Sequence, residues 1–393
     1  MNISGAINSL TGPQAFVDGL SGTWFVVGLG FVASLAFCIL LVLTKSWHGA
    51  FSMDINEGVQ KFHSVPTPRI GGLAIVAALL VCWLNAPPEL KSLIGIFLLA
   101  GLPAFLFGLA EDITKKVSVL QRLLATMASG LLAWWLTDYA LTRVDVWGID
   151  YLLSFALVSI LFTSFAVGGV ANSINIIDGF NGLASTTSTL AFAAFALIAH
   201  QVGDAQLTAI SLVLAACVWG FFWVNWPYGK IFLGDGGSYF LGFSLAWVAV
   251  MLIERNSQVS AFAALLICIH PVTEVLFSVY RRKIKKLHPG HPDRMHFHSL
   301  IKQRYVRRWF SGVSADWCNS ITGLLVGLMT LTAGILANFV YQSTWMALFI
   351  LSFLMLGYVS IYARMVRYEW CSPIYFLFLK PIVKRVSPMS EID

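Results

Sequence analysis

Apolar runs of about membrane-spanning length alternate with short polar stretches along most of the chain. A helix crosses the apolar core of a bilayer, about 30 Å thick, in roughly 20 residues, so each run predicts a transmembrane helix. Eleven runs lie near residues 24–44, 72–86, 93–110, 119–137, 151–169, 183–202, 207–225, 237–253, 259–280, 319–340 and 344–362. The pattern predicts an all-α fold, a polytopic transmembrane bundle of about eleven spans, although two short runs leave ten or twelve open.

Composition places the chain in the same class. Of its 393 residues, 58% are hydrophobic and only 11% are charged, which is typical of a membrane protein and far from the average soluble domain. No repeat and no insertion of soluble-domain size interrupts the runs, so residues 1–393 are expected to form one membrane domain. Within it we expect a large basic loop at 281–318 and a tail at 363–393.

The cations predict the orientation of the bundle. Lys and Arg accumulate in short cytoplasmic loops, and with the N-terminus outside, 22 of the 25 cations fall on the inner side. The distribution predicts a multi-pass protein of the inner membrane with its N-terminus outside and its C-terminus in the cytoplasm. The net charge of +6 then reflects topology, and no basic patch with interleaved aromatic residues indicates a nucleic acid partner.

Five polar loops are predicted on the inner side, whereas the outer connections are brief. They read FHSVPTPRIGG (62–72), GLAEDITKK (108–116), NSINIIDGFNGL (172–183), NWPYGKIFLGDGGS (225–238) and HPGHPDRMHFHSL (288–300). Loops are commonly polar, which would explain any one of them. Five on one face indicate a site for a polar substrate.

Carboxylates in three of these loops indicate a metal ion. Glu111, Asp112, Asp178 and Asp235 each lie near a predicted membrane boundary, where an ionised group still bears part of a cost of about 2.5 to 3.5 kcal/mol at the span centre. A cation is expected to compensate them. Oxygen ligands suit Mg²⁺ or Mn²⁺, and Mg²⁺ usually binds through one or two carboxylates plus substrate phosphates. The substrate is therefore expected to carry phosphate.

Two loops have features that suit phosphate or a nucleobase. In GDGGS, at 234–238, glycines permit close backbone approach and the amides of a following helix favour anions, although an ordinary helix-capping turn explains the same letters. Asn172, Asn175 and Asp178 are spaced by three, which puts them on one face of a helix. Their amides could donate to a substrate, or they could simply end the helix.

The last loop carries His296 and His298 after Arg294. Spaced by two beside a cation, these histidines suit a developing negative charge such as that of a pyrophosphate. A basic loop beside a membrane also commonly meets anionic lipid headgroups, and that reading stays open for the Lys and Arg residues. No Cys and no H-E-x-x-H accompany the histidines, so a zinc site is not indicated.

Taken together and in order, five motifs between residues 60 and 300 resemble a known family. PTPRIGG, the acidic pair, NxxNxxDGxxGL, FLGDGGS and DRxHxH resemble those of the polyprenyl-phosphate N-acetylhexosamine-1-phosphate transferases. That family includes the enzymes that initiate cell-surface polysaccharides and the phospho-MurNAc-pentapeptide translocase. Eleven spans with a cytoplasmic C-terminus resemble the polysaccharide-initiating branch.

The resemblance implies a Mg²⁺-dependent enzyme at the cytoplasmic face. Such an enzyme transfers a sugar 1-phosphate, most often that of GlcNAc, from a UDP-N-acetylhexosamine to undecaprenyl phosphate and releases UMP. It implies catalytic roles for Asp112, Glu111, His296, His298 and Arg294, substrate contacts at Asn172, Asn175, Asp178, Asn181, Phe232 (stacking on uracil) and Gly234, and a metal at Asp235 and Asp112. The chain departs from the pattern at Glu111 and Asn181, where Asp is usual, and at Ser299, where a third His is usual.

The acceptor suggests the mechanism. A phosphate monoester has a second pKa of about 6, so the lipid phosphate is mostly a dianion at neutral pH and needs no strong base. We expect direct attack on the β-phosphorus, with Mg²⁺, Arg294 and the two histidines offsetting charge repulsion and Asp112 acting as proton acceptor or metal-side orienter.

A transporter or lipid flippase is the alternative function. It would require ionisable groups in the middle of spans, for which Glu274, beside His270 and Pro271, is the main candidate. We interpret Glu274 instead as part of a helix kink with a polar partner. The sequence leaves the sugar, the polysaccharide pathway and the oligomeric state, including a homodimer, open.

Overall fold

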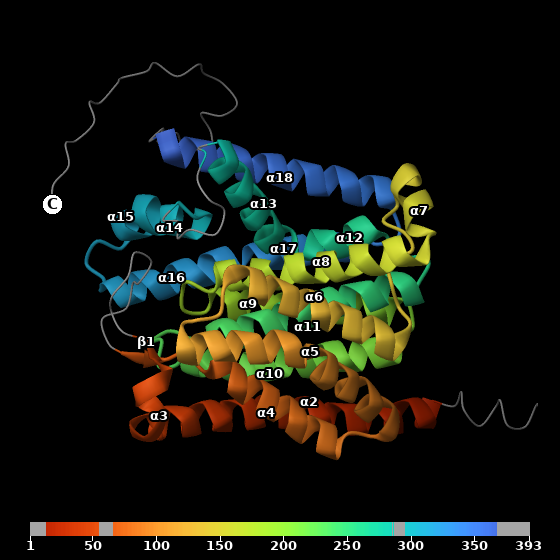
Figure 1. Cartoon of the computed structure of the whole chain (residues 1–393), viewed down its shortest axis with the longest axis horizontal. Helices are drawn as coiled ribbons and strands as arrows, with labels where there is room; N and C mark the ends of the chain where they lie inside the picture. Colours follow the sequence, from red (N-terminus) through yellow and green to blue (C-terminus); the bar gives the residue numbers. More distant parts are fainter. Residues whose placement is uncertain (1–12, 55–65, 285, 287–294, 368–393) are drawn as a thin grey trace, which may run out of the picture.

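A computed structural model describes residues 13–54, 66–284, 286 and 295–367 (Figure 1). The elements are α2 (Pro13–Leu43), α3 (Lys45–Ser52), β1 (Met53–Asp54), β2 (Thr67–Pro68), α4 (Gly71–Asn85), α5 (Pro88–Thr114), α6 (Val119–Thr137), α7 (Trp147–Leu153), α8 (Ala156–Ile177), α9 (Leu183–Gln201), α10 (Ala205–Asn225), α11 (Gly234–Arg255), α12 (Ala261–Ile267), α13 (Ile269–Ile284), α14 (Phe297–Ile301), η1 (Lys302–Val306), α15 (Arg307–Trp309), α16 (Ala315–Gly327), α17 (Met329–Val340) and α18 (Thr344–Arg367). The two short strands pair antiparallel, with Met53 opposite Pro68.

Most of the long helices could cross a membrane. Among the described residues, nine candidates are long and apolar enough, and they lie in α2, α5, α6, α8, α9, α10, α11, the α16–α17 pair and α18. A tenth is α12 with α13, whose axes are bent by 83°, and α4 is apolar but shorter. Each apolar run predicted from the sequence coincides largely with one of these helices or bent pairs, and the run at 151–169 also takes in the end of α7. The all-α, multi-pass membrane fold is confirmed, while the span count of eleven and the sides of the termini stay predictions.

Helix α11 forms the centre of the bundle. Within its most apolar window 94% of residues are buried, against 22% for α18. It packs against α5, α8 and α4, and small residues let these backbones approach closely, as in other membrane helix pairs. A Cβ on Gly242 would collide with the backbone at Ala171 of α8, and one on Gly72 of α4 would collide with Gly237.

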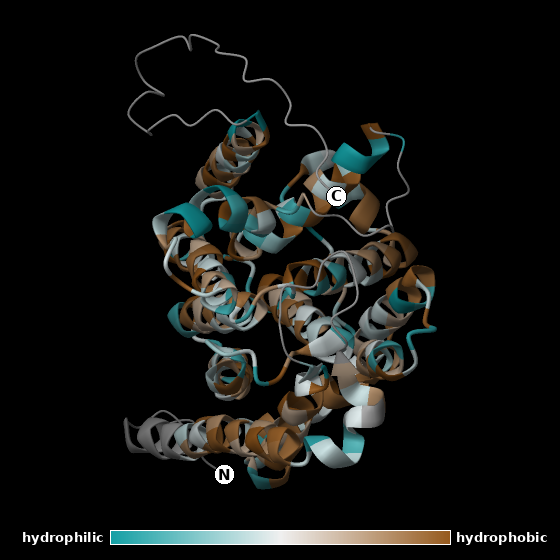
Figure 2. Ribbon diagram, turned by 90° about the vertical axis from the view of Figure 1, so that its left-hand side faces the viewer, coloured by the Kyte–Doolittle hydropathy of each residue, from teal (hydrophilic) through white to brown (hydrophobic). Residues whose placement is uncertain are grey.

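The loops of interest gather at one end of the bundle, called the site end below. There α5 and α8 end, α4, α9 and α11 begin, and β1, α14 and α15 lie close by, at the left of Figure 1. Figure 2 looks onto this end and shows hydrophilic segments among helices that are otherwise largely hydrophobic. The described parts of the polar loops therefore share one face, as the sequence predicted.

At the end of the bundle opposite the site end, Arg143 binds the segment where α11 ends. Its guanidinium donates to the carbonyls of Ile253, Asn256 and Val259, at 3.0, 3.2 and 2.8 Å, where α11 ends. It also lies 2.8 Å from Asp145. One of the few cations predicted on the outer side thus satisfies carbonyls at a helix C-terminus, which have no partner within the helix.

Candidate active site

Asp112 links the end of α5 to the start of α11. Its buried carboxylate accepts hydrogen bonds from the backbone amides of Asp235 and Gly236, both at 2.9 Å. The first amides of a helix have no partner within it and carry partial positive charge, so a carboxylate there is stabilised. Asp112 therefore fixes the backbone that presents Asp235.

Asp235 is the centre of the polar cluster. Its Oδ1 accepts from Arg69 Nη2 at 3.1 Å and from Asn175 Nδ2 at 3.0 Å, and its Oδ2 accepts from Arg122. Arg69 Nη2 also lies 3.5 Å from Asp112 Oδ1. Two guanidinium groups thus balance two buried carboxylates, which is how proteins usually accommodate charge away from water.

Asn175 ties α8 to this cluster. Besides Asp235, its amide nitrogen donates to Ser238 Oγ at 2.9 Å, and its Oδ1 accepts from the Tyr239 hydroxyl at 3.2 Å. All three partners lie in the first turns of α11. The sequence predicted Asn175 at the substrate, and the structure places it beside the charged groups.

Asp178 lies directly after α8, partly buried, and is the third carboxylate of the cluster. Burial raises the pKa of Asp178 well above its ordinary range, Arg69 opposes the increase, and Asp235 and Asp112 add to it. The carboxylates predicted from three separate loops are therefore close enough to interact. Like charges in one site favour protonation of one of them, or a bound cation.

The PTPRIGG loop supports the loop that carries Phe232. The amides of Gly71 and Gly72 donate to the carbonyls of Phe232 and Leu233, at 2.8 and 2.9 Å, and Phe232 N donates to Pro68 O at 2.8 Å. This pairing holds Phe232, partly buried, next to the turn into α11. At that turn Gly234 has a φ of 77°, a conformation that glycine adopts without strain.

Three other predicted site residues are engaged with protein groups. Glu111 Oε2 accepts from Val117 N at 2.8 Å and so holds the turn after α5. Asn172 donates to Gly168 O of its own helix at 2.7 Å. The amide nitrogen of Asn181 donates to Pro227 O at 3.3 Å and to Ser320 Oγ at 3.1 Å.

The contact with Pro227 gives a physical reason for Asn where Asp is usual at position 181. The side chain must donate a hydrogen bond to a carbonyl oxygen, which an amide does and a carboxylate cannot. An aspartate there would place two acceptors against each other.

The two histidines lie beside the Asp178 loop. Their rings stack with centroids 5.4 Å apart, and the ring of His298 meets Phe180 edge-on at 4.9 Å. Burial lowers the pKa of His298 to about 3, so this ring is neutral at neutral pH. His296 Nδ1 lies 2.8 Å from Glu274 Oε1. Arg294, predicted to act with them, lies outside the described residues.

The polar cluster has the donor set of a divalent-cation site without being arranged as one. Within the described part of the chain, no group of three or more His, Cys, Asp or Glu side chains is placed to hold a metal ion. The oxygens of Asp112 and Asp235 are instead hydrogen-bonded to amides and arginines. Two carboxylates at a phosphate site match what Mg²⁺ requires from a protein, since substrate phosphates and water complete its shell.

Two arginines of the cluster were not predicted. The sequence marked Arg69 and Arg122 only as cytoplasmic cations, yet both bind Asp235. The position of Arg69 inside PTPRIGG was the available signal. No sequence signal marked Arg122, because it lies in the first turns of the otherwise apolar helix α6.

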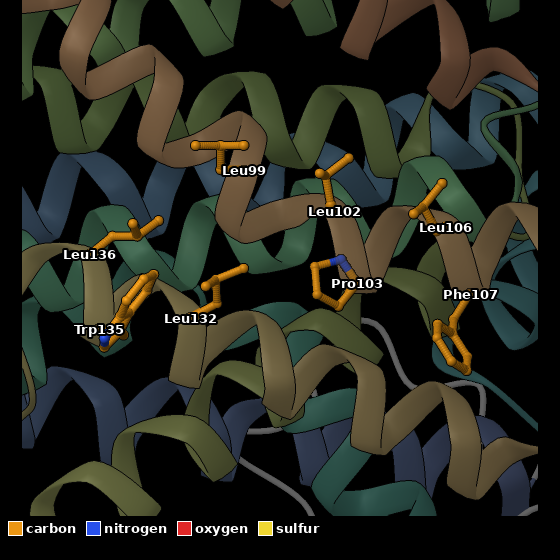
Figure 3. A pocket seen from close by; sticks show the side chains of 8 residues that line it. All are labelled: Leu99, Leu102, Pro103, Leu106, Phe107, Leu132, Trp135 and Leu136. Carbon is orange, nitrogen blue, oxygen red and sulfur yellow. The ribbon is translucent and has the colours of Figure 1, made fainter.

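A groove elsewhere on the bundle is unsuited to a polar substrate. Side chains of α5 and α6 enclose about 470 Å³ around Pro103, Phe107 and Trp135 (Figure 3), and all eight lining residues are apolar. No residue of the polar cluster lines it. It faces outward from the bundle, where lipid chains lie in a membrane.

Comparison with known proteins shows similarity to one family over part of the chain. Residues 94–253, from α5 to α11, match glycosyl transferase family 4. The chain is 26% identical to the probable undecaprenyl-phosphate N-acetylglucosaminyl 1-phosphate transferase of Bacillus subtilis, over 86% of this chain and 90% of that protein. It is also 26% identical to the undecaprenyl-phosphate alpha-N-acetylglucosaminyl 1-phosphate transferase of Yersinia pestis, over 76% and 81%.

A third relative has a different sugar in its name. The phospho-N-acetylmuramoyl-pentapeptide-transferase of Clostridium perfringens is 27% identical over 64% of this chain and 82% of its own length. The family match at residues 94–253 contains Asp112, Asp178 and Asp235. The chain is therefore similar to glycosyl transferase family 4 over residues 94–253, and its relatives carry the names of transferases of the kind that its motifs resemble.

Proposed function

We propose that this protein transfers GlcNAc 1-phosphate from UDP-GlcNAc to undecaprenyl phosphate, forming a polyprenyl-diphosphate sugar and UMP, and so initiates a cell-surface polysaccharide. The observation that supports this most is the cluster of Asp112, Asp178 and Asp235 with Arg69 and Arg122. The names of the relatives from Bacillus subtilis and Yersinia pestis support GlcNAc as the sugar. The inner membrane, with the site end in the cytoplasm, follows from the distribution of cations.

The charges of the cluster suit two phosphorylated substrates. The lipid phosphate and the sugar diphosphate repel each other, and guanidinium groups bind phosphate oxygens through paired hydrogen bonds. Arg69 and Arg122 bind Asp235, so among the described residues they are cations close to where phosphates would lie beside an Asp235-bound ion. We assign them to binding the diphosphate.

A divalent cation completes the proposed site. Asp235, with Asp112, would hold Mg²⁺, or Mn²⁺, together with substrate phosphates. When bound, the ion offsets negative charge on the phosphoryl group in the transition state. Because the Asp112 oxygens accept two backbone amides of α11, we assign Asp112 the role of orienter for Asp235 rather than of proton acceptor.

The proposed reaction is a single displacement. An oxygen of the lipid phosphate forms a bond to the β-phosphorus, and the bond from that phosphorus to the bridging oxygen breaks, so UMP leaves with the electron pair. Phe232 would stack on uracil, Asn172 and Asn175 would meet the nucleotide, and His296, His298 and Arg294 would donate to the diphosphate. A covalent phospho-sugar trapped on any aspartate would contradict this route.

The test is an assay of the purified protein. It combines undecaprenyl phosphate, Mg²⁺ and a panel of UDP-sugars, and it measures UMP release. We expect release with UDP-GlcNAc and loss of that release in Asp235→Asn, which stays folded in detergent. Absence of release with every UDP-sugar, or normal turnover by Asp235→Asn, would contradict the proposal.

A further inference from the structure

Glu274 is a buried carboxylate outside every motif that points to the site. It lies on α13 and is 1% exposed. Its Oε1 is 2.8 Å from His296 Nδ1, its Oε2 accepts from the Tyr358 hydroxyl at 2.6 Å, and the Phe297 amide lies 3.3 and 3.2 Å from its two oxygens. A buried charge is costly unless such donors satisfy it. Three donors converge here on one carboxylate.

The partners of Glu274 come from two other segments. His296 and Phe297 begin α14, and Tyr358 belongs to α18, the last described helix. The sequence suggested His270, one turn earlier on the same helix, as the neighbour of Glu274. Neither ring nitrogen of His270 has a hydrogen-bond partner among the described residues. Glu274 therefore reaches across to the histidine loop instead of bonding within its own helix.

Helix α18 also contacts this segment, and Figure 1 shows α13 and α18 together near α14. The ring of Phe297 stacks on Tyr358, with centroids 4.6 Å apart at 28°. The Tyr362 hydroxyl donates to Met295 O at 2.9 Å and accepts from Arg281 of α13 at 2.5 Å. Residues 295–297 are thus fixed by α13 and α18 together.

We propose that Glu274 is a positioning residue that orients His296 and balances its charge during transfer, with Tyr358 holding the carboxylate in place. The proposal rests on the proposed function, in which His296 meets the sugar diphosphate. With Nδ1–H bound to the carboxylate, Nε2 is the nitrogen left for substrate. Protonated there, the ring donates Nε2–H to a phosphate oxygen while Glu274 offsets its positive charge, as a carboxylate does for other catalytic histidines.

Glu274→Gln removes the negative charge of the side chain but keeps its size and shape. The amide oxygen can still accept from His296 and Phe297, and the amide NH₂ can donate to the Tyr358 oxygen, so packing is retained. We expect kcat for UMP release to fall about 10- to 100-fold, the usual cost of removing a residue that orients a histidine. The KM for UDP-GlcNAc should change less than about threefold, because the lost interaction belongs to the transition state.

A double-mutant cycle with His296→Asn separates positioning from general structural support. If Glu274 acts through His296, Glu274→Gln should cost nothing further in the His296→Asn background. Equal losses in both backgrounds, or unchanged kcat in Glu274→Gln alone, would overturn the proposal. Glu254→Gln is the matched control, since Glu254 accepts from Thr142 at 2.9 Å at the opposite end of the bundle. It should keep normal kcat.

A spectroscopic readout distinguishes this proposal from the proposed function. In ¹⁵N-histidine spectra the His296 signal is the one lost in His296→Asn. That signal should report the Nδ1–H tautomer in the wild-type protein and a mixture of tautomers in Glu274→Gln, because the carboxylate that accepts from Nδ1 becomes an amide that can also donate, while the rings of His270 and His298 and the hydroxyl of Tyr358 remain.

The outcomes of the two measurements are separable. If the wild-type protein is inactive but the tautomer changes in this way, only the proposed function is contradicted, whereas an unchanged tautomer overturns the role of Glu274. Should Glu274→Gln fail to fold, Glu274→Asp keeps the charge but moves it one methylene away from His296, and the same double-mutant cycle applies with the same criteria.

Discussion

At the scale of single residues, adjacent carboxylates in one acidic pair have different surroundings. Asp112 is buried and accepts two amides of α11, while Glu111 accepts one amide of the turn that follows its own helix. The first contact determines where Asp235 lies, and the second only shapes a loop. Glu at position 111 therefore serves the turn after α5, whereas Asp112 holds the start of α11 through both of its oxygens.

Asp112→Asn should reduce transferase activity by about 100-fold or more. The substitution would turn one carboxylate oxygen into an NH₂ group that faces a backbone amide, so the start of α11 would shift. A displacement of a reacting group by about 1 Å can lower activity by about 100-fold. Glu111→Gln keeps an oxygen for Val117 N and should stay within about threefold of wild type. UMP release by both variants is the measurement. Equal damage would show that Glu111 also contacts the reacting groups.

His298 should make stability depend on pH. Burial lowers its pKa to about 3 in the folded protein, whereas an unfolded histidine titrates near about 6.5. Between these values the unfolded chain binds one more proton, so stability is complete above about pH 6.5 and falls as pH decreases, by roughly 1.4 kcal/mol per unit. Thermal unfolding in detergent between pH 5 and 8 measures this. His298→Asn should flatten the dependence, and an unaltered slope would contradict it.

At the scale of elements, the approach of α5 to α11 positions the site. A Cβ on Gly108 would lie 2.6 Å from the backbone of Asp235 and from that of Gly236. Because the neighbouring atoms belong to the backbone, no side-chain rotation can relieve the contact. The two helices would have to move apart. The close approach of α5 to α11 therefore requires a glycine at position 108.

Gly108→Ala should therefore lower activity by about 100-fold, because it displaces the Asp235 backbone. Gly169→Ala on α8 is the matched control, since nothing lies within 4 Å of the added methyl group. It should keep normal activity and unfold at the same temperature as wild type. Comparable activity in both variants would show that α5 and α11 can separate without affecting the site.

The helices themselves could be predicted because the length of an apolar run is a local property of the sequence. Each apolar run became a helix, and the kink near Pro271 was expected because proline removes an amide and clashes with the carbonyl four residues earlier. That carbonyl belongs to Ile267, the last residue of α12. The bend of 83° was not predicted, since its size depends on packing against α17 and α18.

At the scale of the whole molecule, the site joins residues that are distant in sequence. Arg122 and Asp235 are separated by 113 positions, and Arg69 and Asp235 by 166. Spacing within a loop predicted the polar candidates Asn175, Asp178 and Asp235, because their motifs are local. It could not show which cation meets which carboxylate, because that depends on how three helices pack.

The orientation of the whole bundle follows from its cations and can be tested with two glycines. Gly148 lies in α7 at the end opposite the site, Gly312 lies between α15 and α16 at the site end, and nothing lies within 4 Å of a Cβ at either position. The five cysteines in the described part of the chain are buried. Replacing Cys371, outside the described residues, by Ser gives a background in which one added cysteine can be labelled.

In spheroplasts, a membrane-impermeant maleimide should label Gly148→Cys at once and Gly312→Cys only after the membrane is permeabilised. The expectation rests on 22 of 25 cations lying on the inner side, since short loops rich in Lys and Arg are retained in the cytoplasm. Transferase activity of both variants controls for folding. The reverse labelling pattern would place Asp235 outside the cell, where UDP-sugars are not made, and the proposed reaction could not then occur at this site.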